Sequence, residues 1–230
     1  MAGIVLVLIC LRLLADVLFD YWWFQAAGYS SVYTRILLTK VWLWFLGFAV
    51  AFAGAASGIV LARRRTSPGE AVYYRWGRWT FQIPSLRRVV LISCWVLAAL
   101  AGLVGGSAAS ALWKRVLLFL NRVPFGIEDP IFHNDVGFYV FTYPVLKILH
   151  PLLQVLAWVS LGLSVVVYFA SGAFAVQSVS ALPGRVFKHL SRMAAFILVL
   201  TAAGYFLQRY ALLYSSDGVA YGAGYTDVKA

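Results

Sequence analysis

The 230-residue chain is 63% hydrophobic and only 12% charged, and its mean hydropathy is +0.84. Soluble domains are roughly half apolar and a quarter charged, so this composition excludes an ordinary soluble domain and indicates a protein that crosses the membrane several times. Its two cysteines, Cys10 and Cys94, lie within apolar runs, where a thiol usually behaves as a small hydrophobic group.

Five apolar runs approach the roughly 20 residues that a helix needs to cross a hydrocarbon core about 30 Å thick. We therefore predict an all-α fold, a polytopic transmembrane helix bundle in one domain, with helices at about 2–23, 41–61, 89–112, 145–170 and 193–214. A cleaved signal peptide is the alternative for the first run, but no Lys or Arg precedes it. Pro151 bends the fourth helix or marks its true beginning.

The first run contains an unusual charged stripe, formed by Arg12, Asp16 and Asp20 at four-residue spacing. This spacing places the three side chains on one face of a helix, and we expect that face to point into the bundle. A structural role, in which Arg12 and Asp16 neutralise one another, is favoured over a proton or ion path. Both interpretations remain open.

Basic residues in the loops indicate the orientation of the chain, because cytoplasmic loops are enriched in Lys and Arg. The loop of residues 62–88 and the one before the fifth helix carry ten basic residues, against eight on the opposite side. We predict a cytoplasmic N-terminus, with the basic loop along the inner surface. It suits anionic lipid heads, or alternatively RNA, although simple topology signalling is the favoured interpretation. The basic residues of this loop are Arg63, Arg64, Arg65, Arg75, Arg78, Arg87 and Arg88.

Small residues recur every fourth position in the second and third predicted helices, as in Gly47, Ala51 and Ala55. Such spacing lets helix backbones approach closely within a membrane. We predict that these two helices are central packing elements, with a homodimer interface as the alternative. The third helix carries two such series, Ala98, Gly102, Gly106 and Ser110, and Ala101, Gly105 and Ala109.

The segment "FLNRVPFGIEDPIFHNDVGFYVFTYP", residues 119–144, is too interrupted to span a membrane but rich in aromatic residues and turn formers. We predict a folded extracytoplasmic loop that rests on the bilayer. Asp129, His133 and Asp135 could supply donors to a divalent metal, but acidic residues at turns more often cap the backbone. We expect the second role, and no metal.

Three motifs, "LFDYWWFQAAGYSSVYTRIL", "LLFLNRVPFGIEDPIFHNDVGFYVFTYP" and "YFLQRYALLYSSDGVAYGAGYTDVKA", resemble uncharacterised protein family 182, a group of large prokaryotic membrane proteins. The resemblance implies about seven N-terminal transmembrane helices and a large extracytoplasmic region, so this chain would be the N-terminal part of a longer protein. His133 stands where the family suggests glycine, and Val123 where it suggests threonine. The matching positions are Asn121, Arg122, Pro124, Phe125, Gly126, Asp129, Pro130, Phe132, Asp135, Phe138, Tyr139, Pro144, Arg209, Tyr210, Tyr225, Thr226 and Asp227.

No catalytic motif emerges: the chain has no HExxH, CxxC or phosphate-binding loop. We therefore expect no enzyme and no cofactor, but a structural, scaffold or assembly component of the cell envelope. The alternative is a transporter or channel subunit with a polar path near Arg12 and Asp16. Expected partners are anionic lipids at the cytoplasmic face, other membrane proteins or a missing C-terminal part, and not nucleic acid. The expected location is a prokaryotic plasma membrane.

Overall fold

The computed structural model describes residues 2–66, 73–76, 79–82, 86–174, 183–214 and 222. Long helices dominate these ranges, as the composition predicted. The α-helices are α1 (Ala2–Ala26), α2 (Ser30–Arg65), α3 (Leu86–Ala111), α4 (Trp113–Leu120), α5 (Tyr143–Ala170) and α6 (Gly184–Gln208). A π-helical turn, η1 (Phe138–Thr142), leads into α5, and a 3-10 helix, η3 (Arg209–Tyr214), follows α6.

A short antiparallel hairpin between α2 and α3 was not predicted. It pairs β1 (Tyr73–Trp76) with β2 (Trp79–Gln82), so that Tyr73 lies opposite Gln82 and Trp76 opposite Trp79. Both strands are rich in aromatic residues, which favour extended backbone. Strands of four residues are much shorter than a membrane span, so the pattern of long apolar runs does not predict this hairpin.

Within the described ranges, four helical segments are long and apolar enough to cross a membrane: Ser30–Arg65, Arg88–Ala111, Phe138–Ala170 and Gly184–Tyr214. They correspond to the second to fifth predicted spans. The first predicted span forms helix α1 but is not one of these four. The fifth membrane crossing therefore stays a prediction.

Two of the spanning helices begin earlier than the apolar runs suggested. The predicted helix at 41–61 is the central part of α2, which starts at Ser30, and that at 193–214 starts at Gly184. Polar residues such as Thr34 and Lys188 interrupt hydropathy but leave the backbone hydrogen bonds of a helix intact. Helix α5 continues through Pro151.

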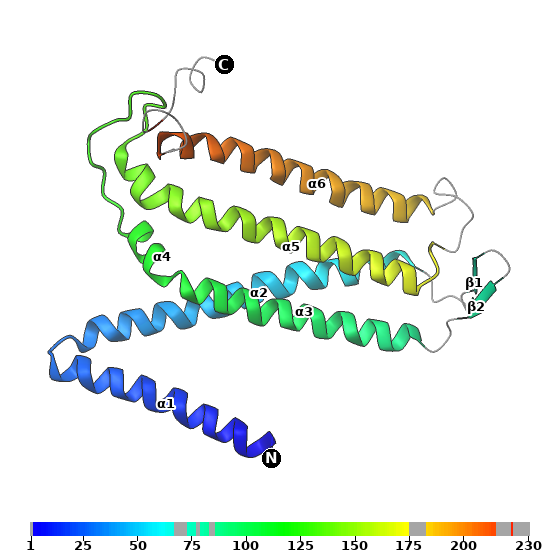
Figure 1. The fold of residues 1–230 in the computed structure, drawn as a ribbon, viewed down its shortest axis with the longest axis horizontal. Helices are drawn as coiled ribbons and strands as arrows, with labels where there is room; N and C mark the ends of the chain where they lie inside the picture. The colour runs from blue at the N-terminus through cyan, green and yellow to red at the C-terminus, as the bar shows by residue number, and fades with distance from the viewer. Residues whose placement is uncertain are drawn as a thin grey trace.

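The helices run back and forth, so that their connections gather at two ends of the bundle (Figure 1). The end of α2, the start of α3, the end of α5 and the start of α6 lie at one end. The α1–α2 turn, α4, the start of α5 and the end of α6 lie at the other, where Gly28 adopts a left-handed φ of 79° after α1.

Glycines bring α2 and α3 into close contact, which confirms the predicted packing of their small residues. A β-carbon at Gly47 would lie 2.6 Å from the carbonyl oxygen of Gly105 and would collide with Ala109. A β-carbon at Gly106 would lie 2.8 Å from the carbonyl oxygen of Trp44. Side chains larger than hydrogen would force the two helices apart.

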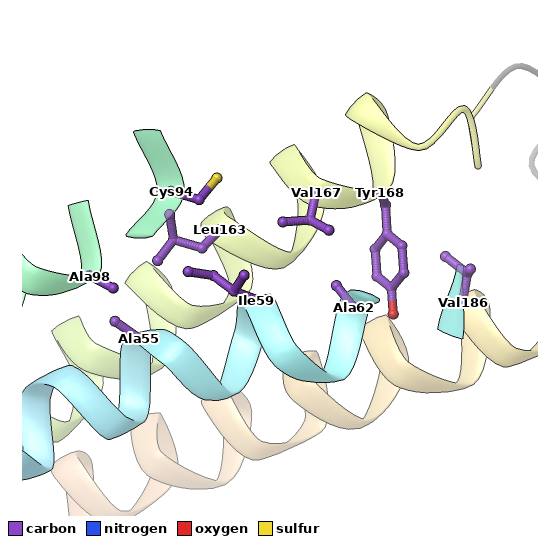
Figure 2. Close-up of a cluster of buried hydrophobic side chains, with 9 residues drawn as sticks. All are labelled: Ala55, Ile59, Ala62, Cys94, Ala98, Leu163, Val167, Tyr168 and Val186. Atoms are coloured by element: carbon purple, nitrogen blue, oxygen red, sulfur yellow. The ribbon is translucent and has the colours of Figure 1, made fainter. Parts of the chain in front are cut away.

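The hydrophobic core lies where α2, α3, α5 and α6 meet (Figure 2). Ile59 and Tyr168 are fully buried in it, and the Cys94 thiol is buried and unoxidised, as expected of a cysteine acting as a small hydrophobe. This core fixes the helices whose far ends carry the candidate site. Its members are Ala55, Ile59, Ala62, Cys94, Ala98, Leu163, Val167, Tyr168 and Val186.

Candidate functional site

The segment between α4 and η1, here called the 121–137 loop, is the most elaborate irregular structure among the described residues. It lies at the end of the bundle where α6 finishes (Figure 1). Glu128 and Asp135 form an isolated antiparallel bridge across it. Two positive φ angles turn the chain, 70° at Gly126 and 54° at His133.

The carboxylate of Asp129 organises one half of the loop and is buried, with 8% of its surface exposed. Its Oδ1 accepts hydrogen bonds from the backbone N–H groups of Ile131 (2.9 Å) and Phe132 (2.6 Å). Its Oδ2 accepts from the N–H of Asn134 (3.0 Å) and from the hydroxyl of Tyr139 (2.6 Å). The acceptor capacity of this side chain is therefore used within the loop.

Asp135 organises the other half in the same manner. Its carboxylate accepts hydrogen bonds from the N–H groups of Phe125 (3.1 Å), Gly126 (2.8 Å) and Gly137 (2.6 Å). A β-carbon at Gly137 would lie 2.7 Å from the Oδ1 of Asp135, so only glycine suits that position. Both carboxylates cap the backbone, which confirms the role that the sequence favoured for them.

These contacts hold both carboxylates in the ionised form. Burial raises the pKa of Asp129, but the hydrogen bonds from Phe132, Tyr139, Asn134 and Ile131 outweigh it and lower the pKa to about 2. The N–H groups of Phe125 and Gly137 lower the pKa of Asp135, against a smaller effect of burial. The two charged carboxylates therefore stabilise the loop and are not free to bind a ligand.

The structure does not assemble the three proposed metal donors into a site. Among the described residues, no group of three or more His, Cys, Asp and Glu side chains is placed to hold a metal ion. His133 is exposed, and its positive φ is the left-handed conformation that glycine adopts most easily. The position therefore suits the glycine that the family resemblance led us to expect.

An aromatic cluster ties this loop to the end of α6, and Tyr210 lies at its centre. The ring centroid of Tyr210 lies 5.1 Å from those of Phe132 and Phe138, 6.1 Å from that of Tyr139 and 6.0 Å from that of Tyr143, all edge-on. Such pairs contribute roughly 0.5–1.5 kcal/mol each beyond simple burial. Sequence reasoning matched Tyr210 to the family but assigned it no contact.

Arg209 closes the cluster from one side. Its guanidinium carbon lies 3.7 Å from the ring centroid of Phe206 and 5.3 Å from that of Phe132, and one of its Nη atoms donates a 2.7 Å hydrogen bond to the Tyr210 hydroxyl. A guanidinium stacked on rings stabilises through cation–π attraction. The loop and the end of α6 thus form one unit.

The remaining predicted residues of the loop lie on its surface. Asn121, Arg122, Pro124 and Pro130 are exposed. The side-chain amide of Asn121 donates 2.8 Å to the carbonyl of Leu117, and Arg122 lies over the ring of Phe119, whose centroid is 4.9 Å away. Asn121 and Arg122 thus contact the end of α4 and not the aromatic cluster.

The predicted basic loop lies at the opposite end of the bundle, and its residues are spread over several elements. Arg63, Arg64 and Arg65 form the last turn of α2, where cations favour the helix dipole. Arg75 lies in β1, Arg87 and Arg88 in α3. Arg78 and the family positions Tyr225, Thr226 and Asp227 lie outside the described residues.

The charged stripe on α1 is exposed, whereas we expected its face to point into the bundle. Arg12, Asp16 and Asp20 all have exposed side chains. Helix α1 packs on the first part of α2: the Tyr33 hydroxyl donates to the carbonyl of Val17 (3.0 Å), and the Tyr33 ring stacks on Phe24. These contacts leave the three charged side chains of the stripe exposed.

A polar seam between α5 and α6, defined by His150, Gln154, Tyr168 and His189, was not recognised from the sequence. The Nε2 of His150 lies 2.7 Å from a backbone carbonyl of α6, Gln154 donates 3.0 Å to the hydroxyl of Thr201, and the Tyr168 hydroxyl lies 2.7 Å from the Nδ1 of His189. Each of these contacts depends on how α5 and α6 lie against one another. Their antiparallel register was the missing signal.

Comparison with known proteins identifies relatives but no activity. Residues 1–230 match the Uncharacterised protein family (UPF0182). A UPF0182 protein of Trichodesmium erythraeum is 33% identical over 95% of this chain and 24% of its own length, and one of Kineococcus radiotolerans is 35% identical over 92% and 21%. One of Pelobacter propionicus is 33% identical over 91% and 24%. No solved structure matches. The chain thus spans about a quarter of the length of these relatives, and it belongs to the uncharacterised protein family UPF0182.

Proposed function

We propose that this chain is a membrane-embedded scaffold of the cell envelope, whose 121–137 loop docks another protein segment. The observation that carries this proposal is a loop whose backbone is held by its own hydrogen bonds and which exposes several apolar side chains. Each carboxylate of the loop accepts hydrogen bonds from three backbone N–H groups of the loop, and Asp129 also accepts one from the Tyr139 hydroxyl. Carboxylates that are engaged in this way are not available to a metal ion or a substrate, whereas the exposed apolar side chains of the loop are available for apolar contact.

The exposed apolar residues of the loop supply the docking surface. Val123, Phe125 and Ile127 leave 64%, 52% and 65% of their surfaces exposed, next to Leu120 at the end of α4 with 68%. Exposed apolar side chains grouped in this way mark interaction surfaces. Because the backbone beneath them is already fixed, binding a partner costs little loop ordering.

The first candidate partner is the additional polypeptide of the longer UPF0182 relatives, of whose length this chain covers only 21–24% in the three described above. The end of α6 lies beside the loop (Figure 1), so a segment continuing from it in such a relative would start near the docking surface. A separate membrane protein would be bound through the same contacts.

A photo-crosslinking amino acid at Ile127 tests the scaffold proposal. We expect it to capture protein when placed at the equivalent position of a full-length relative in native membranes. Adding Asp129→Asn, which loosens the loop, should abolish the crosslink, while Glu128→Gln should leave it unchanged. Crosslinks to lipid alone, or crosslinks that persist with Asp129→Asn, would overturn the proposal.

The polar seam favours a second candidate function, a proton-conducting transporter. His150 and Tyr168 lie 18 residues apart on α5, about 27 Å at 1.5 Å per residue, which is close to the thickness of the hydrocarbon core. Between them, Ser164 donates to the carbonyl of Gly58 on α2 (3.1 Å). Hydroxyl and imidazole groups both donate and accept protons, as a relay requires.

Two buried atoms in the seam distinguish it from a purely structural set of hydrogen bonds. Oε1 of Gln154 and Nε2 of His189 have no hydrogen-bond partner among the described residues, at a cost of about 1–3 kcal/mol each. Purified chain in liposomes carrying a pH-sensitive dye tests this candidate: Gln154→Leu should slow proton flux, and Ser107→Ala on the exposed face of α3 should not. Flux equal to that of empty liposomes would refute it.

We further propose the plasma membrane as the location, with the N-terminus in the cytoplasm and the basic last turn of α2 against anionic lipid heads. Cysteines placed at Val123 and at Arg64, in a chain lacking Cys10 and Cys94, test the orientation. An impermeant thiol reagent added to intact cells should label only the cysteine at 123. Labelling only at 64 would invert the proposed topology.

A further inference from the structure

An apolar groove lies between α2, α3 and α5, on the side where α4 begins. Its volume is about 490 Å³, within the range of roughly 300–1,000 Å³ typical of small-molecule sites. The walls include Val104 of α3 and Leu149 and Val155 of α5, which are 69%, 47% and 60% exposed. The groove is therefore open along its side, where lipid would surround a membrane-spanning bundle.

Small residues create the depth of this groove. Gly47 and Ala51 of α2 and Gly105, Ala108 and Ala109 of α3 all line it. Glycines and alanines let α2 and α3 approach closely and leave no side chains to fill the space in front of α5. The result is a hydrocarbon-lined channel beside three long helices, a shape suited to a flexible acyl chain.

In the part of the chain that the structure describes, Arg115 is the only charged residue that lines the groove. It lies in the first turn of α4 (Trp113–Leu120), where Lys40 lies over the ring of Trp113, 5.4 Å from its centroid. Trp and Lys at this level are typical of the membrane interface. No Asp or Glu occurs in residues 86–127 or 136–216, so α3, α4 and α5 offer no carboxylate to Arg115.

We propose that this groove binds one anionic phospholipid, with an acyl chain along α3 and α5 and the phosphate on Arg115. A guanidinium suits a phosphate because its donors match two of the oxygens at once. The site lies at the opposite end of the bundle from the basic last turn of α2 (Figure 1), so it is distinct from the anionic-lipid surface predicted there. The groove also includes no residue of the 121–137 loop.

Charge complementarity decides between this occupant and others. An apolar helix of another protein would fill the groove but leave the Arg115 guanidinium without an anion at the membrane interface. A neutral phospholipid would place a second cation, its choline group, close to the arginine. An anionic headgroup such as phosphatidylglycerol offers the phosphate without that cation.

Native mass spectrometry of the full chain in neutral detergent tests the proposal, with equal amounts of phosphatidylglycerol and phosphatidylcholine added. We expect phosphatidylglycerol adducts to dominate, and Arg115→Gln to reduce them about tenfold. Lys114→Gln is the matched control, because Lys114 is an exposed neighbour on the same helix that does not line the groove; it should change the adducts by less than twofold. Ala108→Phe should fill the groove and remove adducts of both lipids.

Helix content and melting in the same detergent establish that each variant is folded, and Val104→Trp replaces Ala108→Phe if the latter is not. Equal binding of the two lipids by the unaltered chain would overturn the headgroup assignment. Equal losses with Arg115→Gln and Lys114→Gln would show a diffuse attraction to basic residues and not a site. Adducts that survive both groove-filling variants would overturn the placement of the acyl chain.

Discussion

Replacing Asp129 by asparagine should loosen the 121–137 loop without altering its volume. The side chain now accepts four hydrogen bonds, two at each carboxylate oxygen. In the variant, the bonds at the remaining oxygen lose their charge, at about 1 kcal/mol each, and the new amide donor faces the N–H of Asn134 and the Tyr139 hydroxyl. The hydroxyl can rotate to accept, but the backbone N–H of Asn134 loses its acceptor.

The sum of these losses is about 3 kcal/mol, since one charge-assisted bond is worth about 1.5–3 kcal/mol and water compensates part of the change near the surface. If the asparagine side-chain amide were rotated by 180°, its NH2 group would face the N–H groups of Ile131 and Phe132. The loss of free energy would then be no smaller. A loss of about 3 kcal/mol in local opening corresponds to amide exchange faster by a factor on the order of 100.

Hydrogen–deuterium exchange of the detergent-solubilised chain measures this effect directly. The amides of Ile131, Phe132 and Asn134 should lose protection in Asp129→Asn, while amides in the middle of α2 should not change. Glu128→Gln is the matched control, because Glu128 is exposed beside Asp129. Unchanged protection of the three amides in Asp129→Asn would refute the claim that this carboxylate holds the loop.

The remaining predictions concern acid, helix packing and the aromatic cluster. Because the pKa of Asp129 is lower in the folded protein (about 2) than the roughly 3.9 of an unfolded chain, its stabilisation is complete above about pH 4 and is lost as the pH falls towards 2; the difference in melting temperature between the unaltered chain and Asp129→Asn should shrink over that range. Gly47→Ala should lower the melting temperature through overpacking that costs about 1–3 kcal/mol, whereas Gly162→Ala, on a helix face with nothing within 4 Å, should not lower it. Tyr210→Leu should speed proteolysis of the 121–137 loop, and Tyr205→Leu, at a 69% exposed position, should not.

The helical class and the packing of α2 on α3 followed from the sequence because both depend on local patterns. Long apolar runs define a membrane helix wherever it lies, and small residues at four-residue spacing mark a close contact whatever the partner helix is. The close approach of Gly47 to Gly105 realises such a pattern. The sequence did not predict where α2 and α6 begin, because their first turns contain polar residues and therefore lie outside the apolar runs.

Contacts between distant segments were beyond the reach of these patterns. Tyr210 contacts Phe138, which lies 72 residues earlier in the chain, and His189 contacts Tyr168, which lies 21 residues earlier. Each partner is unremarkable alone, since a tyrosine or histidine in an apolar run has many structural roles. Only the antiparallel register of α5 and α6, and the path of the loop above them, brings these side chains together.

His133 shows how the loop tolerates a departure from the glycine that the family resemblance suggests. Its φ of 54° lies in the left-handed region, which costs a residue with a β-carbon roughly 1 kcal/mol or more. The turn is fixed on both sides of His133, since the Asp129 carboxylate binds the N–H groups of Phe132 and Asn134, and the N–H of His133 itself donates to the carbonyl of Asp129 (3.1 Å). Three hydrogen bonds, two of them to a charged acceptor, exceed that strain. The capping carboxylate, and not the residue at the apex, therefore determines the shape of this turn, and the imidazole of His133 is left exposed.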